Sequence, residues 1–147
     1  MDLNVMKSLI VGAIPWVQMS DIRVDWFKPC WVKLSVPVQE KHLNHVGMVY
    51  SATQVMLMEV TGAALFIATY GPNLFTPIIK DMSVNYLRPS YRDIACELRI
   101  EEKEAALKIE PIKKRGRGSW PLDMAVTDAT GARISISTCR YYLIAAK

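Results

Sequence analysis

Residues 47–69, GMVYSATQVMLMEVTGAALFIAT, are the most informative part of this 147-residue chain for its fold. It contains no proline, and nearly every residue in it is apolar or small, with Met56, Leu57 and Met58 at its centre. Such a run is typical of a helix that is buried on all sides. We therefore predict a central helix over residues 47–69 that forms the core of the domain.

One carboxylate interrupts this helix. Glu59 is the only formally charged residue between His42 and Ile79. Burial of an unpaired charge costs several kcal/mol unless the group is paired or its pKa rises, and carboxylates with shifted pKa values cluster at catalytic sites. Glu59 is therefore a candidate catalytic residue. The alternative is that it reaches an exposed edge of the helix or pairs with an arginine across an interface.

Segments that alternate between apolar and polar residues flank the helix, as strands do. Six segments show this alternation, at residues 22–26, 32–38, 82–86, 94–100, 120–126 and 132–138. Their short connections favour antiparallel pairing. We predict an α+β fold in which a curved antiparallel sheet of five or six strands wraps the long helix. Residues 1–15 predict an N-terminal helix, and 101–114 predict a surface helix or a solvated connection outside the core.

Length and composition indicate one globular domain spanning residues 1–147. The 51% hydrophobic content favours a subunit interface in addition to a core, and the net charge of +4 favours anionic partners. The three cysteines are odd in number and far apart, which indicates reduced thiols in a cytoplasmic protein. A membrane span is not expected, because Glu59 and the Gly71–Pro77 breaks interrupt the apolar stretch.

The residues before the central helix offer polar groups at a helix N-terminus. Asn44, Gly47 and the free N–H groups beyond them are placed to stabilise an oxyanion or a carbonyl dipole. Asn44 is alternatively a plain cap or turn residue. His42 and His45 lack a third strong ligand, so we predict no metal site.

One basic cluster lies near Trp120. It is suited to binding phosphates or a nucleic-acid backbone, although a run this short is usually solvated surface; it consists of Lys113, Lys114, Arg115 and Arg117. The chain has no nucleophile elbow, phosphate-binding loop or dinucleotide fingerprint, which disfavours serine hydrolases, NTPases and Rossmann oxidoreductases.

Four motifs together resemble the hotdog-fold acyl-CoA thioesterases, especially the phenylacetate-degradation-like enzymes and an adjacent uncharacterised bacterial subgroup. The resemblance covers residues 32–142. The motifs are Asn44-His45-Val46-Gly47, Glu59-Val60-Thr61-Gly62, the stretch MSVNYLRP at residues 82–89, and the stretch VTDATG at residues 126–131.

The resemblance implies roles for individual residues. Asn44 matches the family's asparagine that positions the thioester, and Glu59 matches its catalytic base or nucleophile. The family's His-Gly-Gly run corresponds here to Tyr50-Ser51-Ala52, a departure that still leaves the N–H of Ser51 or Ala52 for the oxyanion, with Cβ atoms that narrow the approach.

The resemblance also implies a homodimer or homotetramer with the site at a subunit interface. Coenzyme A would be part of the substrate, with no separate cofactor. Its phosphates would lie at the surface near basic residues, the candidates being Arg88, Lys113, Lys114, Arg115 and Arg117.

Three hypotheses follow. The first is a cytoplasmic thioesterase in which Glu59 and Asn44 act on an acyl-CoA-type thioester. The second is a non-catalytic binder of acyl-CoA or a fatty acid on the same fold. Nucleic-acid binding through residues 113–117 and Trp120 ranks last, because basic and aromatic residues do not recur along a surface. We expect neither a nucleic-acid nor a membrane partner.

Overall fold

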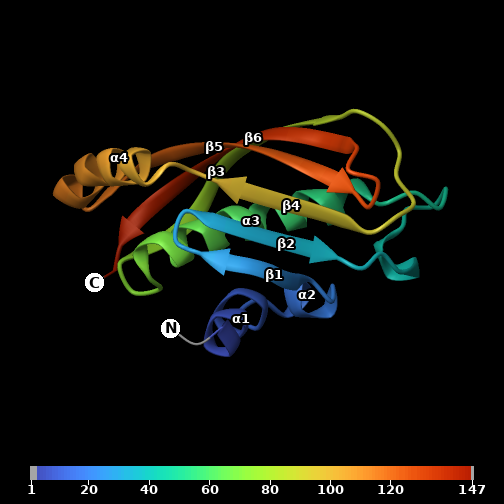
Figure 1. Cartoon of the computed structure of the whole chain (residues 1–147), viewed down its shortest axis with the longest axis horizontal. Coiled ribbons are helices and arrows are strands. Elements are labelled where there is room, and N and C mark those ends of the chain that lie inside the picture. The colour runs from blue at the N-terminus through green and yellow to red at the C-terminus, as the bar shows by residue number, and fades with distance from the viewer. Residues whose placement is uncertain (1–2, 147) are drawn as a thin grey trace.

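A computed structural model describes residues 3–146 (Figure 1). Its centre is the helix α3 (Ser51–Tyr70), which packs against one face of a six-stranded antiparallel sheet in the order β1-β2-β4-β5-β6-β3. The strands are β1 (Arg23–Lys28), β2 (Trp31–Val36), β3 (Phe75–Tyr86), β4 (Ile94–Arg99), β5 (Arg117–Asp128) and β6 (Arg133–Ala145). The remaining helices are α1 (Leu3–Val11), α2 (Pro15–Met19), η1 (Glu40–His42) and α4 (Glu102–Arg115). The predicted α+β class, the long central helix and the sheet of five or six strands are confirmed.

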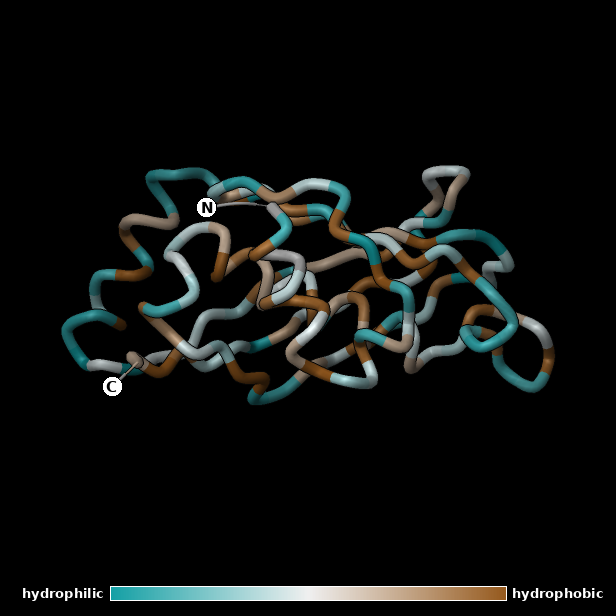
Figure 2. The backbone as a smooth tube through the Cα atoms, turned by 90° about the horizontal axis from the view of Figure 1, so that it is seen from below, coloured by the Kyte–Doolittle hydropathy of each residue, from teal (hydrophilic) through white to brown (hydrophobic). Residues whose placement is uncertain are grey.

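The period-two pattern builds the core between sheet and helix. Along β2, Val32, Leu34 and Val36 are fully buried, while the residues between them are half-buried. Alternate residues of β4, β5 and β6 are buried in the same way and meet the apolar side chains of α3. Hydrophilic residues are concentrated at the two ends of the molecule, one of which is formed by α4 (Figure 2).

The central helix begins at residue 51, so the prediction of a start at residue 47 is wrong by four residues. The reason is a tight turn before it. The Asn44 N–H donates to the Met48 carbonyl at 2.8 Å, and the Gly47 N–H donates to the Asn44 carbonyl at 3.0 Å. Gly47 has a φ of +79°, which the turn requires and which a helix does not allow.

The expectation that the helix is buried on all sides is also wrong, because one row of residues along α3 is partly exposed. The residues of this row are only half-buried and recur mostly at intervals of four, and they are Ala52, Val55, Glu59, Ala63 and Ile67. We call this set the open stripe of α3. By length and composition α3 also suffices to cross a membrane, but 61% of its most apolar window is buried inside this fold.

Helices outside the sheet lie at the start of the chain and between β4 and β5. The predicted N-terminal helix over 1–15 is described only as Leu3–Val11, since residues 1 and 2 lie outside the described part, and α2 follows from Pro15. The segment 101–114 is a helix, but it is not wholly outside the core. Ala105, Ile109 and Ile112 of α4 are buried.

β3 is an edge strand of twelve residues. Within the described part of the chain it pairs with β6 on one side only, with a bulge between Ile79 and Asp81. Its half-buried Ile79, Met82 and Val84 pack against the core, and the strand contacts α3. A long unpaired edge is a surface that natural sheets usually cover or pair.

Candidate active site

The turn before α3 is held by the side chain of Asn44. Its Oδ1 accepts hydrogen bonds from the N–H groups of Val46 and Met48, both at 3.0 Å. Asn44 is therefore a turn residue, as one alternative from the sequence proposed. Its Nδ2 makes no hydrogen bond to another described residue, so the amide keeps donors that can face a ligand.

Asn44 lines a surface cavity of about 570 Å³ between this turn, the start of α3 and the end of β3. We call it the Asn44 cavity. The residues that matter for its chemistry are Asn44, His45, Tyr50, Ser51, Gln54 and Arg88. The volume is within the range of small-molecule sites.

The first turn of α3 points free donors towards this region. The N–H groups of Ser51 and Ala52 have no carbonyl within the helix to bond, and Ser51 lines the Asn44 cavity. The positive end of the helix dipole lies at the same place. Gly47 is a correction: its N–H is occupied by the Asn44 carbonyl, so it is a turn residue and does not serve as an oxyanion donor.

Gln54 is a polar residue that sequence reasoning missed. It is buried, with 5% of its surface exposed, and its Nε2 donates to the Val49 carbonyl at 3.4 Å. Its Oε1 has no hydrogen-bond partner among the described residues, although it belongs to a side chain lining the Asn44 cavity. Buried acceptors of this kind are rare in proteins. A signal was present in the sequence, since Gln54 is the only amide side chain within residues 47–69.

Glu59 lies in the middle of the open stripe. Burial raises the pKa of its carboxyl group above the ordinary value. The side chain makes no ion pair or hydrogen bond with any described residue. The alternative that Glu59 reaches a more exposed edge of the helix therefore describes this structure, and the pairing with an arginine does not occur within the described residues.

The backbone at Glu59 is held by a hydrogen bond from the sheet. The hydroxyl of Tyr141, a fully buried residue of β6, donates to the Glu59 carbonyl at 2.5 Å. Gly62 makes this contact possible, because a Cβ at that position would lie 2.1 Å from the Tyr141 hydroxyl oxygen. Gly62 thus allows the helix backbone near Glu59 to lie close to Tyr141 of the sheet.

The structure of one chain does not bring Asn44 and Glu59 together. Glu59 does not line the Asn44 cavity. Eight residues of helix separate it from Ser51, which corresponds to roughly 12 Å along the axis.

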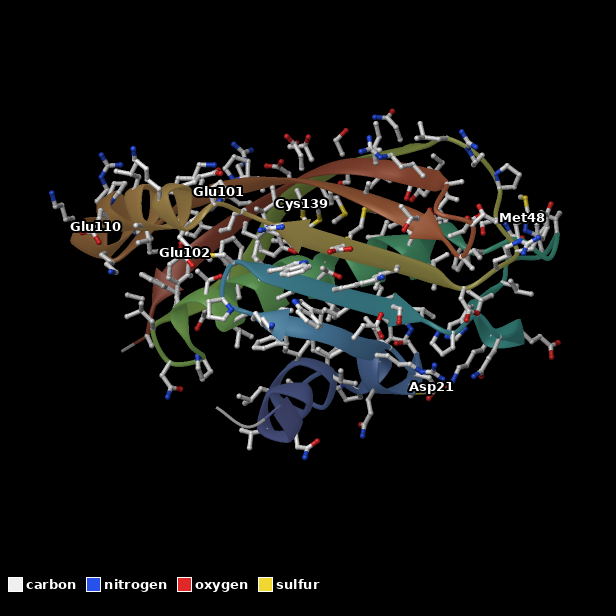
Figure 3. The ribbon with its side chains drawn as sticks, viewed as in Figure 1. Asp21, Met48, Glu101, Glu102, Glu110 and Cys139 are labelled. Atoms are coloured by element: carbon white, nitrogen blue, oxygen red, sulfur yellow. The ribbon has the colours of Figure 1, made fainter. Side chains whose placement is uncertain are left out.

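The basic residues are divided between the two ends of the molecule. Arg88 lines the Asn44 cavity. Lys113, Lys114, Arg115 and Arg117 lie at the end of α4 and the start of β5, and Lys113 pairs with Glu110. Figure 3 places Met48, from the Asn44 turn, and Glu110 at opposite ends of the molecule. Trp120 is 1% exposed, so its ring cannot stack on a nucleic-acid base.

His42 has a structural position. Its Nδ1 accepts from the Gln39 N–H at 2.9 Å, and its Nε2 lies 2.8 Å from the Ser20 carbonyl. Because one nitrogen accepts, the other carries the proton and donates, which describes a neutral imidazole bonded on both sides. Among residues 3–146, no three side chains of the metal-binding types gather in one place.

The long helix against an antiparallel sheet in this strand order is the hotdog fold of thioesterases, which confirms the resemblance seen in the sequence. The chain belongs to the family described as a domain of unknown function, DUF4442, which matches residues 4–143. No protein of curated function matches the sequence.

Solved structures share the fold across nearly the whole chain. A Pseudomonas aeruginosa protein described as of unknown function and a probable thioesterase is 28% identical, covers 99% of this chain and 97% of its own, and has a TM-score of 0.89. A Haemophilus influenzae thioesterase is 15% identical, with coverage of 99% and 92% and a TM-score of 0.74. A hypothetical thioesterase from Streptococcus pneumoniae, solved with coenzyme A, is 13% identical, with coverage of 99% and 99% and a TM-score of 0.70.

Proposed function

We propose that this protein hydrolyses an acyl-CoA-type thioester at a site shared between two subunits. The observation that carries the proposal is that free helix N–H groups and the free Nδ2 of Asn44 lie at the Asn44 cavity, while the same helix carries a half-buried carboxylate, Glu59, without a partner among the described residues. The likeness to the probable thioesterase from Pseudomonas aeruginosa supports it.

In the proposed reaction, the thioester carbonyl accepts hydrogen bonds from the N–H of Ser51 or Ala52 and from Asn44 Nδ2. These donors stabilise the negative charge that develops on the oxygen. The Glu59 carboxylate takes a proton from water, and the hydroxide adds to the carbonyl carbon. The tetrahedral intermediate then expels the thiolate, which takes the proton back from Glu59. The products are a carboxylic acid and a free thiol.

A second route uses the same residues. Glu59 attacks the carbonyl directly, and the thiolate leaves as an anhydride forms. Water then cleaves the anhydride to the acid and the Glu59 carboxylate, and the proton that this step frees converts the thiolate to the thiol. For the first route, the raised pKa of Glu59 is favourable, because a general base works best when its pKa approaches the operating pH.

The site requires a second subunit in this proposal. The open stripe of α3 is half-buried and apolar apart from Glu59, and β3 presents an edge with no strand partner among the described residues, with mostly exposed side chains. If two copies pair there around a twofold axis, Glu59 of the partner subunit approaches the Asn44 cavity, which one chain alone does not achieve. We propose a homodimer, or a homotetramer built from such dimers.

The charge of the chain suits an anionic carrier. Arg88, in the Asn44 cavity, is the first candidate to bind a phosphate of coenzyme A. The other basic candidates lie at the far end of the molecule from the Asn44 cavity. They could contact a phosphate of coenzyme A bound there only from another subunit; they are Lys113, Lys114, Arg115 and Arg117. No separate cofactor is proposed. The three free, buried cysteines suit the reducing cytoplasm, where we place the protein.

The test is thiol release from a panel of acetyl, hexanoyl, phenylacetyl and palmitoyl thioesters of coenzyme A. We expect wild-type turnover on at least one member, and a loss of about 100-fold or more in kcat for Glu59→Gln at equal folded concentration. Glu40→Gln, at an exposed carboxylate outside the site, is the control and should retain activity. Full activity of Glu59→Gln would remove Glu59 from the mechanism.

A non-catalytic acyl-CoA or fatty-acid binder is the second candidate. Tyr50 favours it, since its half-exposed ring stands at the helix start where the resembled enzymes have histidine followed by two glycines. Saturable binding by calorimetry with no thiol release across the panel would establish the binder. Nucleic-acid binding is not proposed, because the buried Trp120 removes its aromatic contact.

A further inference from the structure

A second cavity lies on the other side of Tyr50. It measures about 300 Å³ and lies between α2 and the start of α3. Its apolar wall consists of Trp16, Met19, Met56 and the ring of Tyr50, and its polar wall of Ser20, Lys41, His42 and Thr53. We call it the α2 cavity.

The polar side chains of this cavity are already bonded within the protein. Ser20 Oγ donates to the Val17 carbonyl at 2.6 Å, Thr53 Oγ1 donates to the His42 carbonyl at 3.2 Å, and Lys41 pairs with Asp21. Both ring nitrogens of His42 are occupied as well. A ligand therefore finds few free donors or acceptors there, and mainly apolar surface remains for binding.

That apolar surface is unusually exposed. Trp16 and Met19 are 59% and 71% exposed, although the helix that carries them is anchored by Val17, which is 2% exposed. The short α2 thus holds two large apolar side chains at the rim of the cavity. Burying them against a hydrocarbon group would remove apolar area from water.

The two cavities have complementary chemistry. The Asn44 cavity is lined by Asn44, whose Nδ2 is free, and by Gln54, whose buried Oε1 has no partner among the described residues, whereas the polar side chains of the α2 cavity are already bonded, and Tyr50 lines both cavities. A ligand spanning both cavities would be polar at one end and apolar at the other.

We propose that the α2 cavity binds the acyl group of the substrate, with Trp16 and Met19 as specificity-determining residues and Tyr50 at the junction. This rests on the proposed thioester function. Because the cavity is near the lower limit for small-molecule sites, the acyl group is a short or medium chain or a single aromatic ring.

The experiment measures binding of two non-hydrolysable thioethers, S-methyl-coenzyme A and S-hexyl-coenzyme A, by calorimetry. We expect wild type to bind the hexyl compound about tenfold or more tightly than the methyl compound. In Trp16→Ala, and in Met19→Glu, which places a charge at the apolar rim, this ratio should fall to about threefold or less. Trp26→Ala removes a partly exposed tryptophan from β1 and should keep the wild-type ratio.

The outcomes separate this inference from the proposed activity. Equal affinity for the two thioethers in wild type, or a tenfold ratio retained in both variants at the α2 cavity, would overturn the assignment even if the protein hydrolyses thioesters. A ratio lost in Trp16→Ala and Met19→Glu, together with no thiol release from any thioester, would support the acyl cavity and overturn hydrolysis.

Discussion

Glu59 carries a partly buried carboxyl group on a part of the backbone that is fixed by a hydrogen bond. Its position on the open stripe takes the carboxyl group partly out of water, and the hydrogen bond from Tyr141 to its carbonyl keeps the backbone in place. No described residue offers a cation in return. A carboxylate in such surroundings weakens the folded state and is typical of a functional site.

The pH dependence of stability tests whether the buried carboxylate of Glu59 weakens the folded state. Because burial raises the pKa of Glu59 in the folded state, the folded protein holds the proton more tightly than the unfolded chain. The free energy of unfolding therefore falls as the pH rises from the ordinary value through the raised one. We expect Glu59→Gln to be more thermostable than wild type at about pH 8 and to lose most of that advantage at about pH 4.

The measurement is the melting temperature of wild type and of Glu59→Gln in thermal denaturation at the two pH values. The exposed-site variant Glu40→Gln is the control. A melting temperature of Glu59→Gln below that of wild type at the higher pH would contradict the account.

The side-chain amide of Asn44 has a structural role through Oδ1 and a proposed catalytic role through Nδ2. Two substitutions distinguish these roles. Asn44→Asp keeps an oxygen for the N–H groups of Val46 and Met48 but removes the Nδ2 donor. We expect it to fold with nearly wild-type stability and to lose about tenfold or more in turnover. Asn44→Ala should lose turnover and also about 1 kcal/mol of stability.

Urea denaturation and thiol release on the same preparations distinguish the two roles. If Asn44→Asp retains full turnover, the residue serves the turn alone.

At the scale of elements, α4 shows how a polar segment becomes part of the core. Its composition is charged, yet its buried residues recur at intervals of four and three and pack on β5. The fit is close, since a Cβ on Gly118 of β5 would lie 2.8 Å from Ile112. The predicted alternative of a solvated connection is therefore wrong.

Two substitutions on α4 measure this docking. Ile109 is 2% exposed, and Ile109→Ala should lower the free energy of unfolding by about 2–5 kcal/mol. Leu107, on the opposite side and 66% exposed, is the matched control, and Leu107→Ala should change stability by about 0.5 kcal/mol or less. Chemical denaturation compares them, and equal effects would contradict the packing of α4 on the sheet.

For the whole molecule, the proposed interface with a second copy is the surface formed by the open stripe of α3 and the edge of β3. Ala63 lies one turn after Glu59 on that stripe. Ala63→Arg is tolerable in a single chain because the position is half-exposed, but it would place a bulky charge within the proposed interface.

We therefore expect sedimentation velocity to show wild type as a dimer or tetramer and Ala63→Arg as a smaller species with little turnover. Leu107→Arg, on α4, should retain the wild-type size. A wild-type protein that remains monomeric at micromolar concentration and still hydrolyses thioesters would contradict the shared site.

The class of fold could be predicted from the sequence, because local periodicity carries that information. The apolar run of 47–69 has the length and composition of a core helix, and period-two alternation marks the strands that cover it. Glu59 and Asn44 also stood out from the sequence, one as a lone charge in an apolar run and the other as a polar residue before a helix.

Which of these groups lie close together could not be predicted from the sequence and depends on the three-dimensional fold. It placed Arg88 in the Asn44 cavity and residues 113–117 at the far end, left the Oε1 of Gln54 unpaired, and opened a second cavity beside Tyr50. It also exposed a stripe of α3 that composition alone presents as buried. The physical reason is that burial and hydrogen bonding depend on segments distant in sequence, and no local pattern records which neighbours the fold supplies.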